Sequence, residues 1–371
     1  MVKLIANYLP QYHQIPENDR WWGEGYTDWE AVKKCKPLYF GHNQPRIPYQ
    51  RDYYALDNID SIKRQAEYAT RYGIYGFGIY HYWFSSEMQL LQKPAELLLN
   101  NRNIDIHYMF IWDNATWKRT WSNVKTGNDW APMFENSQNS GNGILAELIY
   151  GNEEDWKKHL EYLLPFFEDD RYIKIDNKPL FGIFNQDGDS EIITNMMSYW
   201  DGLLKEKGFA GLFDLGKQNS YGIESTKWQF IYNPEWDGWV WHSQFQRIKN
   251  RIQKDLSKLA NKPLLYDYNK IWDRIIKTAE KTGENVFLSG FVDYDDSPRR
   301  GAKGRIVRNA SPEKFEKYLA KLLQISKKQN KEYLFLTAWN EWGEGAYLEP
   351  DETHGFDYLE AIKRAVDSCS E

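Results

Sequence analysis

The stretch Tyr-Leu-Phe-Leu-Thr-Ala-Trp-Asn-Glu-Trp-Gly-Glu-Gly at residues 333–345 carries the main evidence for the fold. Its first part, residues 333–339, is apolar and rich in β-forming residues, which predicts a buried strand. Glu341 and Glu344 follow this strand in a turn, where Gly343 and Gly345 allow the backbone to bend sharply. A buried strand that ends in a polar turn before a helix is the repeating unit of parallel α/β folds.

The same unit recurs along the chain, because short apolar runs alternate with longer segments of helical spacing. Ser311 followed by Pro312 is typical of a helix start, with a capping serine and proline at the first helical position. The predicted strands are 3–9, 74–80, 105–112, 180–184, 210–215, 229–232, 286–292 and 333–339, and the predicted helices include 58–71, 153–165, 189–206, 266–281, 311–328 and 355–367. Eight parallel strands with intervening helices predict the (β/α)8 TIM barrel of the α/β class.

Length and composition favour one domain. The chain has 371 residues and 42% hydrophobic content, which suits a single barrel with a large core. No linker and no internal repeat divides it, so we expect a single (β/α)8 catalytic domain over 1–371. Residues 122–152 are polar and rich in glycine, which predicts an insertion loop after the third strand.

The charge and the cysteine content disfavour several classes of protein. The formal net charge of −6 gives no long-range attraction to nucleic acid or to anionic membranes. The two cysteines, Cys35 and Cys369, lie near opposite ends of the chain and predict neither a disulfide framework nor a zinc site. The amino-terminal residues lack a leader-like apolar run, so a cytoplasmic location is expected. The sequence leaves the oligomeric state open.

The active site of such a barrel is built by the loops that follow the carboxyl ends of the strands. Aromatic residues make up 16% of the chain, and Trp and Tyr can stack on sugar rings while they hydrogen bond to hydroxyl groups, although large cores use them too. Polar and aromatic side chains gather at the predicted strand ends. The candidate substrate-binding residues are Tyr8, His81, Trp83, Trp112, Asp113, Asn114, Trp117, Arg119, Asp295, Arg299, Asn340, Trp342 and Tyr347.

Glu341 and Glu344 are the candidate catalytic residues. Cleavage of a glycosidic bond needs one carboxyl group to protonate the leaving oxygen and a second to act as base or nucleophile. Trp339, Trp342 and Tyr347 would shield a carboxylate from water and raise the pKa of the group that donates the proton. The spacing does not show which glutamate that is, and paired glutamates in a loop are more often solvated surface charges.

Other chemistries fit less well. Residues 211–218 nearly match a phosphate-binding loop, but Gln218 lacks the hydroxyl that binds magnesium and the middle of the segment is strand-like. Asp293, Asp295 and Asp296 form either a carboxylate metal site or a solvated acidic loop. We favour the solvated loop. We therefore expect no metal and no cofactor.

Several motifs in fixed order resemble those of the WbsX-like branch related to glycoside hydrolase family 99, the endo-α-mannosidases. They are Tyr-Leu-Pro-Gln-Tyr-His at 8–13, Trp-Trp-Gly-Glu-Gly-Tyr-Thr-Asp-Trp at 21–29, the runs at 72–77 and 80–84, Arg-Tyr-Ile-Lys-Ile-Asp-Asn-Lys-Pro-Leu at 171–180, Ser-Pro-Arg-Arg at 297–300, and residues 339–351. The resemblance implies a barrel and metal-free, retaining cleavage. It further implies that Glu341 deprotonates the 2-hydroxyl of the sugar, giving a 1,2-anhydro sugar, and that Glu344 is the general acid/base. Relatives carry a pocket glutamate where this chain has Ala115, and Asp113 is new.

Three functions follow as hypotheses. The leading one is an endo-acting glycoside hydrolase that cleaves a bacterial surface-type polysaccharide or oligosaccharide. The alternative is a glycosyltransferase of cell-surface polysaccharide biosynthesis, a label given to proteins of this branch. The third is a carbohydrate-binding protein without catalytic activity. Each of the three takes a carbohydrate as its partner.

Overall fold

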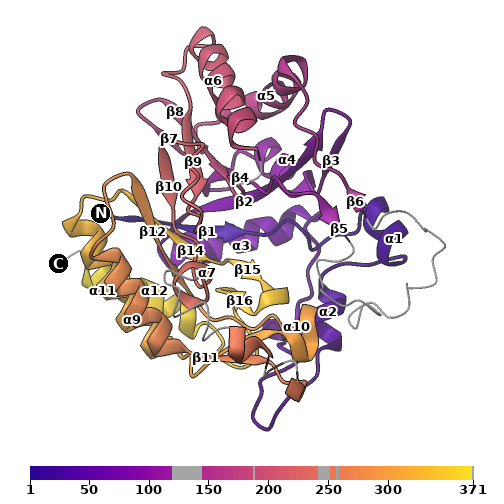
Figure 1. The fold of residues 1–371 in the computed structure, drawn as a ribbon, viewed down its shortest axis with the longest axis vertical. Helices are drawn as coiled ribbons and strands as arrows, with labels where there is room; N and C mark the ends of the chain where they lie inside the picture. Colours follow the sequence, from indigo (N-terminus) through magenta and orange to yellow (C-terminus); the bar gives the residue numbers. More distant parts are fainter. Residues whose placement is uncertain (119–143, 187–188, 241–250, 256, 258, 370–371) are drawn as a thin grey trace.

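A computed structural model describes residues 1–118, 144–186, 189–240, 251–255, 257 and 259–369. Eight parallel strands close into a barrel (Figure 1). In barrel order they are β1 (Lys3–Tyr8), β2 (Ile74–Ser85), β4 (His107–Trp112), β8 (Lys178–Ile183), β9 (Phe213–Lys217), β10 (Trp228–Phe230), β12 (Val286–Phe291) and β14 (Tyr333–Thr337). Each predicted strand overlaps one of these, and the pairing of β14 with β1 closes the ring. The predicted (β/α)8 barrel is therefore confirmed.

The predicted helices are also present, with ends that differ from the prediction by up to a few residues. They are α3 (Ile59–Arg71), α5 (Glu153–Phe167), α6 (Ser190–Glu206), α9 (Tyr268–Ala279), α11 (Pro312–Lys328) and α12 (Asp357–Ser368). The side chain of Ser311 accepts a hydrogen bond from the backbone of Lys314, which satisfies a free N–H group of the first turn of α11. Figure 1 shows α9, α11 and α12 packed side by side against one part of the barrel.

Shorter elements decorate the barrel. The helices among them are α1 (Pro16–Trp22), α2 (Trp29–Lys34), α4 (Lys93–Asn100), α7 (Glu235–Gly238), α10 (Ser297–Arg300), η1 (Tyr49–Arg51), η4 (Gly301–Lys303) and η5 (Trp342–Glu344). The strands among them are β3 (Met88–Leu90), β5 (Trp117–Lys118), β6 (Ile144–Ala146), β7 (Lys174–Ile175), β11 (Leu264–Asp267), β13 (Arg305–Arg308), β15 (Asn340–Glu341) and β16 (Ala346–Tyr347). Several of these follow the carboxyl ends of barrel strands, where the active site is expected.

The predicted insertion loop lies only partly within the described residues. Residues 122–143 fall outside them, whereas β6 pairs with β5 and Asn152 caps α5. Among the described helices, none combines the length and the apolar character that crossing a membrane requires. The extent of the domain and the cytoplasmic location stay predictions.

Much of the aromatic content belongs to the core. Trp112, Trp200, Trp272, Trp339 and Trp342 are all fully buried. Burial of such large rings supplies much of the hydrophobic stabilisation of a fold. For these five tryptophans, a role in the core is therefore a better interpretation than stacking on a sugar.

Candidate active site

A tight hairpin after β14 positions the two candidate catalytic glutamates. Strands β15 and β16 pair so that Glu341 lies opposite Ala346, and η5 forms the turn between them. Gly345 adopts φ of +58°, and a Cβ atom there would lie 3.0 Å from side-chain atoms of Arg46 and Asp295. A side chain at position 345 would therefore be strained both by its backbone conformation and by its neighbours.

One guanidinium group binds both carboxylates. The η nitrogens of Arg299 lie 2.9 Å from Glu341 Oε1 and 3.1 Å from Glu344 Oε1. The same side chain contacts Asp28 Oδ2 at 2.9 Å. The contact to Glu341 is an ion pair without hydrogen-bond alignment, since Glu341 Oε1 has no partner in hydrogen-bond geometry among the described residues. Both glutamates are thus held next to the same cation.

Three short elements bring these groups together. Helices α2 and α10 pack against each other and against η5. Asp28 directly precedes α2, Arg299 belongs to α10 and Glu344 ends η5. The cluster carries three acidic groups and one cation, so binding by Arg299 is needed to offset the repulsion among the carboxylates.

The two carboxylates differ in burial. The side chain of Glu341 is 7% exposed and that of Glu344 is 21% exposed. Burial raises the pKa of Glu341 well above its usual range, Arg299 lowers it, and the nearby Glu344 raises it further. A carboxylate with a raised pKa accepts a proton more readily than an ordinary one, which suits acid–base chemistry near neutral pH.

Four tyrosines surround the pair: Tyr80, Tyr82, Tyr232 and Tyr294. Burial is the main reason that the pKa of each hydroxyl lies well above its usual range, and Glu341 or Glu344 adds to the effect in each case. The Tyr80 hydroxyl donates to the Tyr232 hydroxyl at 3.3 Å. These phenols stay neutral at physiological pH and can donate hydrogen bonds to a sugar or to a carboxylate.

Asp113 lies beside this site at the end of β4. Burial raises the pKa of its carboxyl to about 6, while Lys217 and a hydrogen bond from Asn185 oppose the shift. Lys217 ends β9, which confirms that residues 211–218 contain a strand. The near match to a phosphate-binding loop is therefore a coincidence of sequence.

Four of the expected substrate-binding residues are buried with partners inside the protein. They are Tyr8, Trp112, Asn114 and Asn340, each at most 3% exposed. Asn340 exchanges hydrogen bonds of 2.7 and 2.9 Å with the backbone of Leu9. The remaining contacts are Tyr8 to Gln65, Trp112 to the Trp83 carbonyl, and Asn114 to Asn185 and Tyr150. These four side chains hold the strand ends in place from behind the site.

His81 and Trp83 point toward helix α5. His81 Nε2 lies 2.8 Å from His159 Nε2, and the ring of Trp83 stacks on the ring of His159 with centroids 4.3 Å apart. Burial lowers the pKa of His81 to about 3, so the ring stays neutral. The expectation that His81 lines a groove is thus corrected, because alternate side chains of a strand point to opposite faces.

Two aromatic residues of the active-site hairpin stack on each other. The rings of Trp342 and Tyr347 have centroids 3.7 Å apart, and the Trp342 indole donates to Glu349 at 2.7 Å.

Trp117 packs edge-on against Tyr82, with ring centroids 5.0 Å apart, and remains partly exposed next to the tyrosines of the site. Arg119 lies outside the described residues.

The acidic turn after β12 is not a solvated loop. Asp295 and Asp296 are fully buried, and Asp295 accepts from His42, Gln44 and the backbone of Ser297 at 2.7 to 3.0 Å. These hydrogen bonds and Arg46 outweigh burial and lower the pKa of Asp295 to about 2. The solvated loop is therefore corrected, whereas a substrate-binding role of Asp295 stays a prediction.

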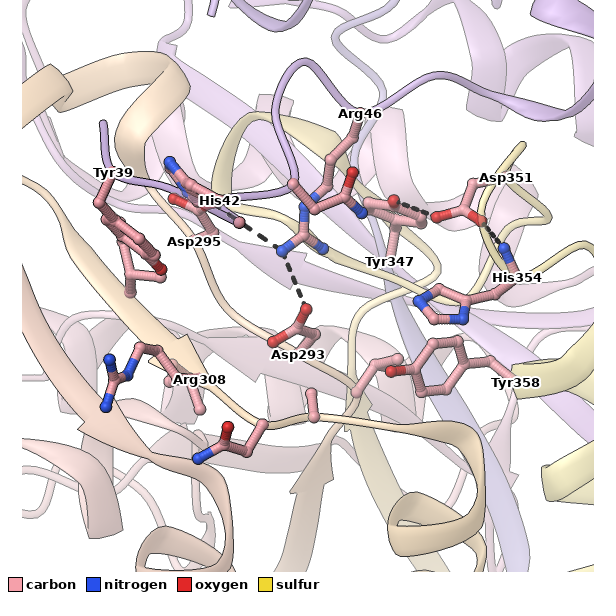
Figure 2. A pocket seen from close by; sticks show the side chains of 17 residues that line it. Tyr39, His42, Arg46, Asp293, Asp295, Arg308, Tyr347, Asp351, His354 and Tyr358 are labelled. Carbon is pink, nitrogen blue, oxygen red and sulfur yellow. Dashed lines mark hydrogen bonds and ion pairs between the residues drawn. The ribbon is translucent and has the colours of Figure 1, made fainter. Parts of the chain in front are cut away.

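Each carboxylate of this turn has a basic partner. Arg46 binds Asp293 at 2.9 Å and lies 3.9 Å from Asp295, and Arg300 binds Asp296 at 3.3 Å. Figure 2 shows Arg46 reaching Asp293 in a cavity of about 290 Å³ that Tyr347 and His354 also line. In the described part of the chain, no group of three or more His, Cys, Asp or Glu side chains is arranged to hold a metal ion.

Some residues of the site were missed in the sequence. Asp28 stands within the 21–29 motif, but nothing local shows that it meets Arg299, 271 positions away. Tyr80 and Tyr232 each end a predicted strand, so the rule that strand ends build the site could have found them.

Comparisons with known proteins agree with this architecture. A protein 27% identical, the uncharacterized protein WxcX of Xanthomonas campestris pv. campestris (strain B100), aligns over 98% of this chain and 49% of its own length. The chain thus spans about half the length of this curated relative. The structure of a GH99 endo-alpha-mannosidase from Bacteroides thetaiotaomicron superposes with a TM-score of 0.57 at 12% identity, over 100% of this chain and 98% of that one.

A second solved structure, described as a glycoside hydrolase-like protein, matches with a TM-score of 0.52 and 12% identity over 98% of this chain and 93% of its own. At such identities the two structures show a shared fold. The family model described as glycosyltransferase WbsX matches residues 4–362, nearly the whole chain. The chain therefore belongs to the WbsX family of carbohydrate-active proteins, on a barrel like that of family 99.

Proposed function

We propose that this protein is an endo-acting, retaining glycoside hydrolase that cleaves a bacterial surface-type polysaccharide or oligosaccharide. The observation that carries the proposal is the binding of Glu341 and Glu344 to the single guanidinium of Arg299, at 2.9 and 3.1 Å. Two carboxyl groups that can act on one sugar are the minimum requirement for acid–base cleavage of a glycosidic bond.

The resemblance to family 99 supplies the assignment of roles. Glu341 takes the proton of the 2-hydroxyl as that oxygen attacks the anomeric carbon, and Glu344 protonates the oxygen that leaves. Glu344 then deprotonates a water molecule that opens the 1,2-anhydro sugar at the anomeric carbon, and Glu341 returns the proton to the 2-oxygen. Two inversions at the same carbon give net retention, and both carboxyl groups return to their initial states.

This division of labour requires Glu341 to be ionised when the sugar binds, although a raised pKa also suits a proton donor. Burial raises the pKa of Glu341, and a weakly acidic hydroxyl needs a strong proton acceptor. Glu344 is the more exposed of the two, as a group that exchanges protons with incoming water must be. Arg299 favours the ionised form of Glu341, because its charge lowers the pKa of that carboxyl.

The description of the family favours a second candidate, a glycosyltransferase. The same two carboxyl groups could activate a sugar hydroxyl as acceptor in place of water. The two candidates differ in the donor, because a transferase of this kind consumes an activated sugar such as a nucleotide sugar.

A panel of defined bacterial polysaccharides tests the proposal. We expect the wild-type protein to release fragments with one water added per cleaved bond, detected by mass spectrometry, and Glu341→Gln and Glu344→Gln to release none. Calorimetry with nucleotide sugars runs in parallel. Micromolar binding of a nucleotide sugar, together with intact polysaccharides, would establish transfer instead.

A further inference from the structure

A separate pocket opens at the carboxyl ends of β8, β9 and β10. Its volume is about 300 Å³, which is at the lower end of small-molecule sites, about 300 to 1,000 Å³, and fits one sugar ring. Aromatic rings and amides make up much of the wall. The lining residues that the argument uses are Phe184, Asn185, Lys217, Tyr232 and Glu235.

This pocket adjoins the catalytic carboxylates. Tyr232 lines it and at the same time accepts the hydrogen bond from Tyr80. The Tyr232 hydroxyl interacts electrostatically with both Glu344 and Glu341. A sugar in this pocket would therefore be a near neighbour of a sugar held between the glutamates.

Lys217 and Glu235 form an ion pair on the pocket wall. Lys217 Nζ lies 3.1 Å from Glu235 Oε2 and 3.9 Å above the centre of the Phe184 ring. The lysine side chain is 14% exposed and the glutamate side chain 39% exposed. Glu235 occupies one of the three donors of the ammonium group, and the carboxylate keeps lone pairs for further hydrogen bonds.

Such a pair matches two neighbouring hydroxyl groups. One hydroxyl accepts from the ammonium while the other donates to the carboxylate, and the aromatic rings offer apolar faces to the C–H groups of the sugar. We infer that this pocket is a second sugar subsite, in which the Lys217–Glu235 pair recognises adjacent hydroxyls of a neutral sugar unit next to the cleaved bond. This inference rests on the proposed function and identifies the residues that would select its substrate.

The charges favour a neutral sugar over an acidic one. Glu235 balances the charge of Lys217, and Asp113 adds a further carboxyl group that interacts with the same ammonium. A uronic acid would bring another carboxylate to a site without net positive charge. Electrostatics therefore gives an anionic substituent no advantage here.

Binding of defined disaccharides tests the subsite without depending on turnover. The full chain carrying Glu344→Gln is titrated with cellobiose, maltose, α-1,3-mannobiose and digalacturonic acid by saturation-transfer NMR. We expect at least one neutral disaccharide to bind, and Lys217→Met to weaken that binding about tenfold, the effect of losing one charge-assisted hydrogen bond. Lys227→Met is the matched control, because Lys227 is exposed just before β10, and should change affinity less than twofold.

The outcomes separate the subsite from the reaction. Glu235→Gln is titrated alongside Lys217→Met, so that the subsite is tested by two variants. The melting temperature of each variant shows whether it has a folding defect. Unchanged affinity in both variants, binding of digalacturonic acid alone, or no binding at all would overturn the subsite. A wild-type protein that cleaves no polysaccharide, yet binds a neutral disaccharide through Lys217, would refute hydrolysis and keep the subsite.

Discussion

Two acidic turns follow neighbouring barrel strands, and their carboxylates are bound differently. After β12, Asp293 and Asp295 both lie within ion-pair distance of Arg46, and Asp295 also accepts hydrogen bonds from His42, Gln44 and the Ser297 backbone. After β14, Glu341 and Glu344 share one arginine. A hydrogen bond of 2.6 Å from the Asp295 backbone to the Glu344 carbonyl joins the two turns. Proximity and burial alone therefore do not distinguish the candidate catalytic turn from the other acidic turn.

The pKa values express the difference. Three hydrogen bonds lower the pKa of Asp295 to about 2, so this group carries a fixed charge at any physiological pH. Burial and Glu344 raise the pKa of Glu341, against the effect of Arg299. A general acid or base works best when its pKa is near the working pH, and the shift of Glu341 is upward from the usual range whereas that of Asp295 is downward.

The largest effect is expected from the glutamates. Glu341→Gln and Glu344→Gln keep the shape but remove the proton-transfer group, so kcat on the cleaved polysaccharide should fall about a thousandfold or more. The melting temperature should change little, because Arg299 keeps two of its three carboxylate partners in each variant. Near-normal turnover in both variants would refute their assignment as the catalytic pair.

The second effect is on stability and belongs to the other turn. Asp295→Asn places an amide among donors that require a carboxylate, and we expect a loss of about 3 kcal/mol in the free energy of unfolding, measured by urea titration. The wild-type pKa of Asp295 lies below the unfolded value of about 4, so its stabilisation is complete above that pH and is lost as the pH falls toward about 2. The free energy of unfolding of Asp295→Asn should lack this acid-dependent part. If it falls with decreasing pH as steeply as that of the wild type, the prediction is contradicted.

A smaller effect is expected from the shared cation. Arg299 lowers the pKa of Glu341, so Arg299→Met should raise that pKa further. The acid limb of the kcat/KM profile should then move to higher pH by about one unit, which lowers kcat/KM roughly tenfold at pH values below the limb. Arg299→Lys keeps the charge and should shift the limb less. A profile in Arg299→Met that matches the wild type would show that Arg299 does not control the pair.

Asp113 gives the smallest expected effect. Its carboxyl titrates near pH 6 and, when ionised, can accept a hydrogen bond from a sugar hydroxyl. Asp113→Asn should raise KM only a few-fold and remove the dependence of KM on pH around 6, with kcat unchanged. Steady-state kinetics between pH 5 and 8 checks this, and a large fall in kcat would instead place Asp113 in the proton transfer.

The strands and helices could be predicted from the sequence, because they depend on interactions between neighbouring residues. Barrel strands are buried on both faces and read as continuous apolar runs, and a cap such as Ser311 acts within one turn. The position of Glu341 and Glu344 after the last strand followed from the same pattern. The direction of a side chain at a strand end did not, since His81 and Asn114 are as polar as groove residues but point into the protein.

The order of strands and helices and the position of the two glutamates follow from short stretches of sequence, because they depend on residues a few positions apart. Which charges meet depends instead on how the whole chain folds. Asp28 and Arg299 are 271 positions apart, and His42 and Asp295 are 253 apart, so each pair exists only once the barrel has closed. The pKa of a carboxyl group depends on those distant partners and on burial, and so the difference in pKa between the two acidic turns is a property of the folded chain.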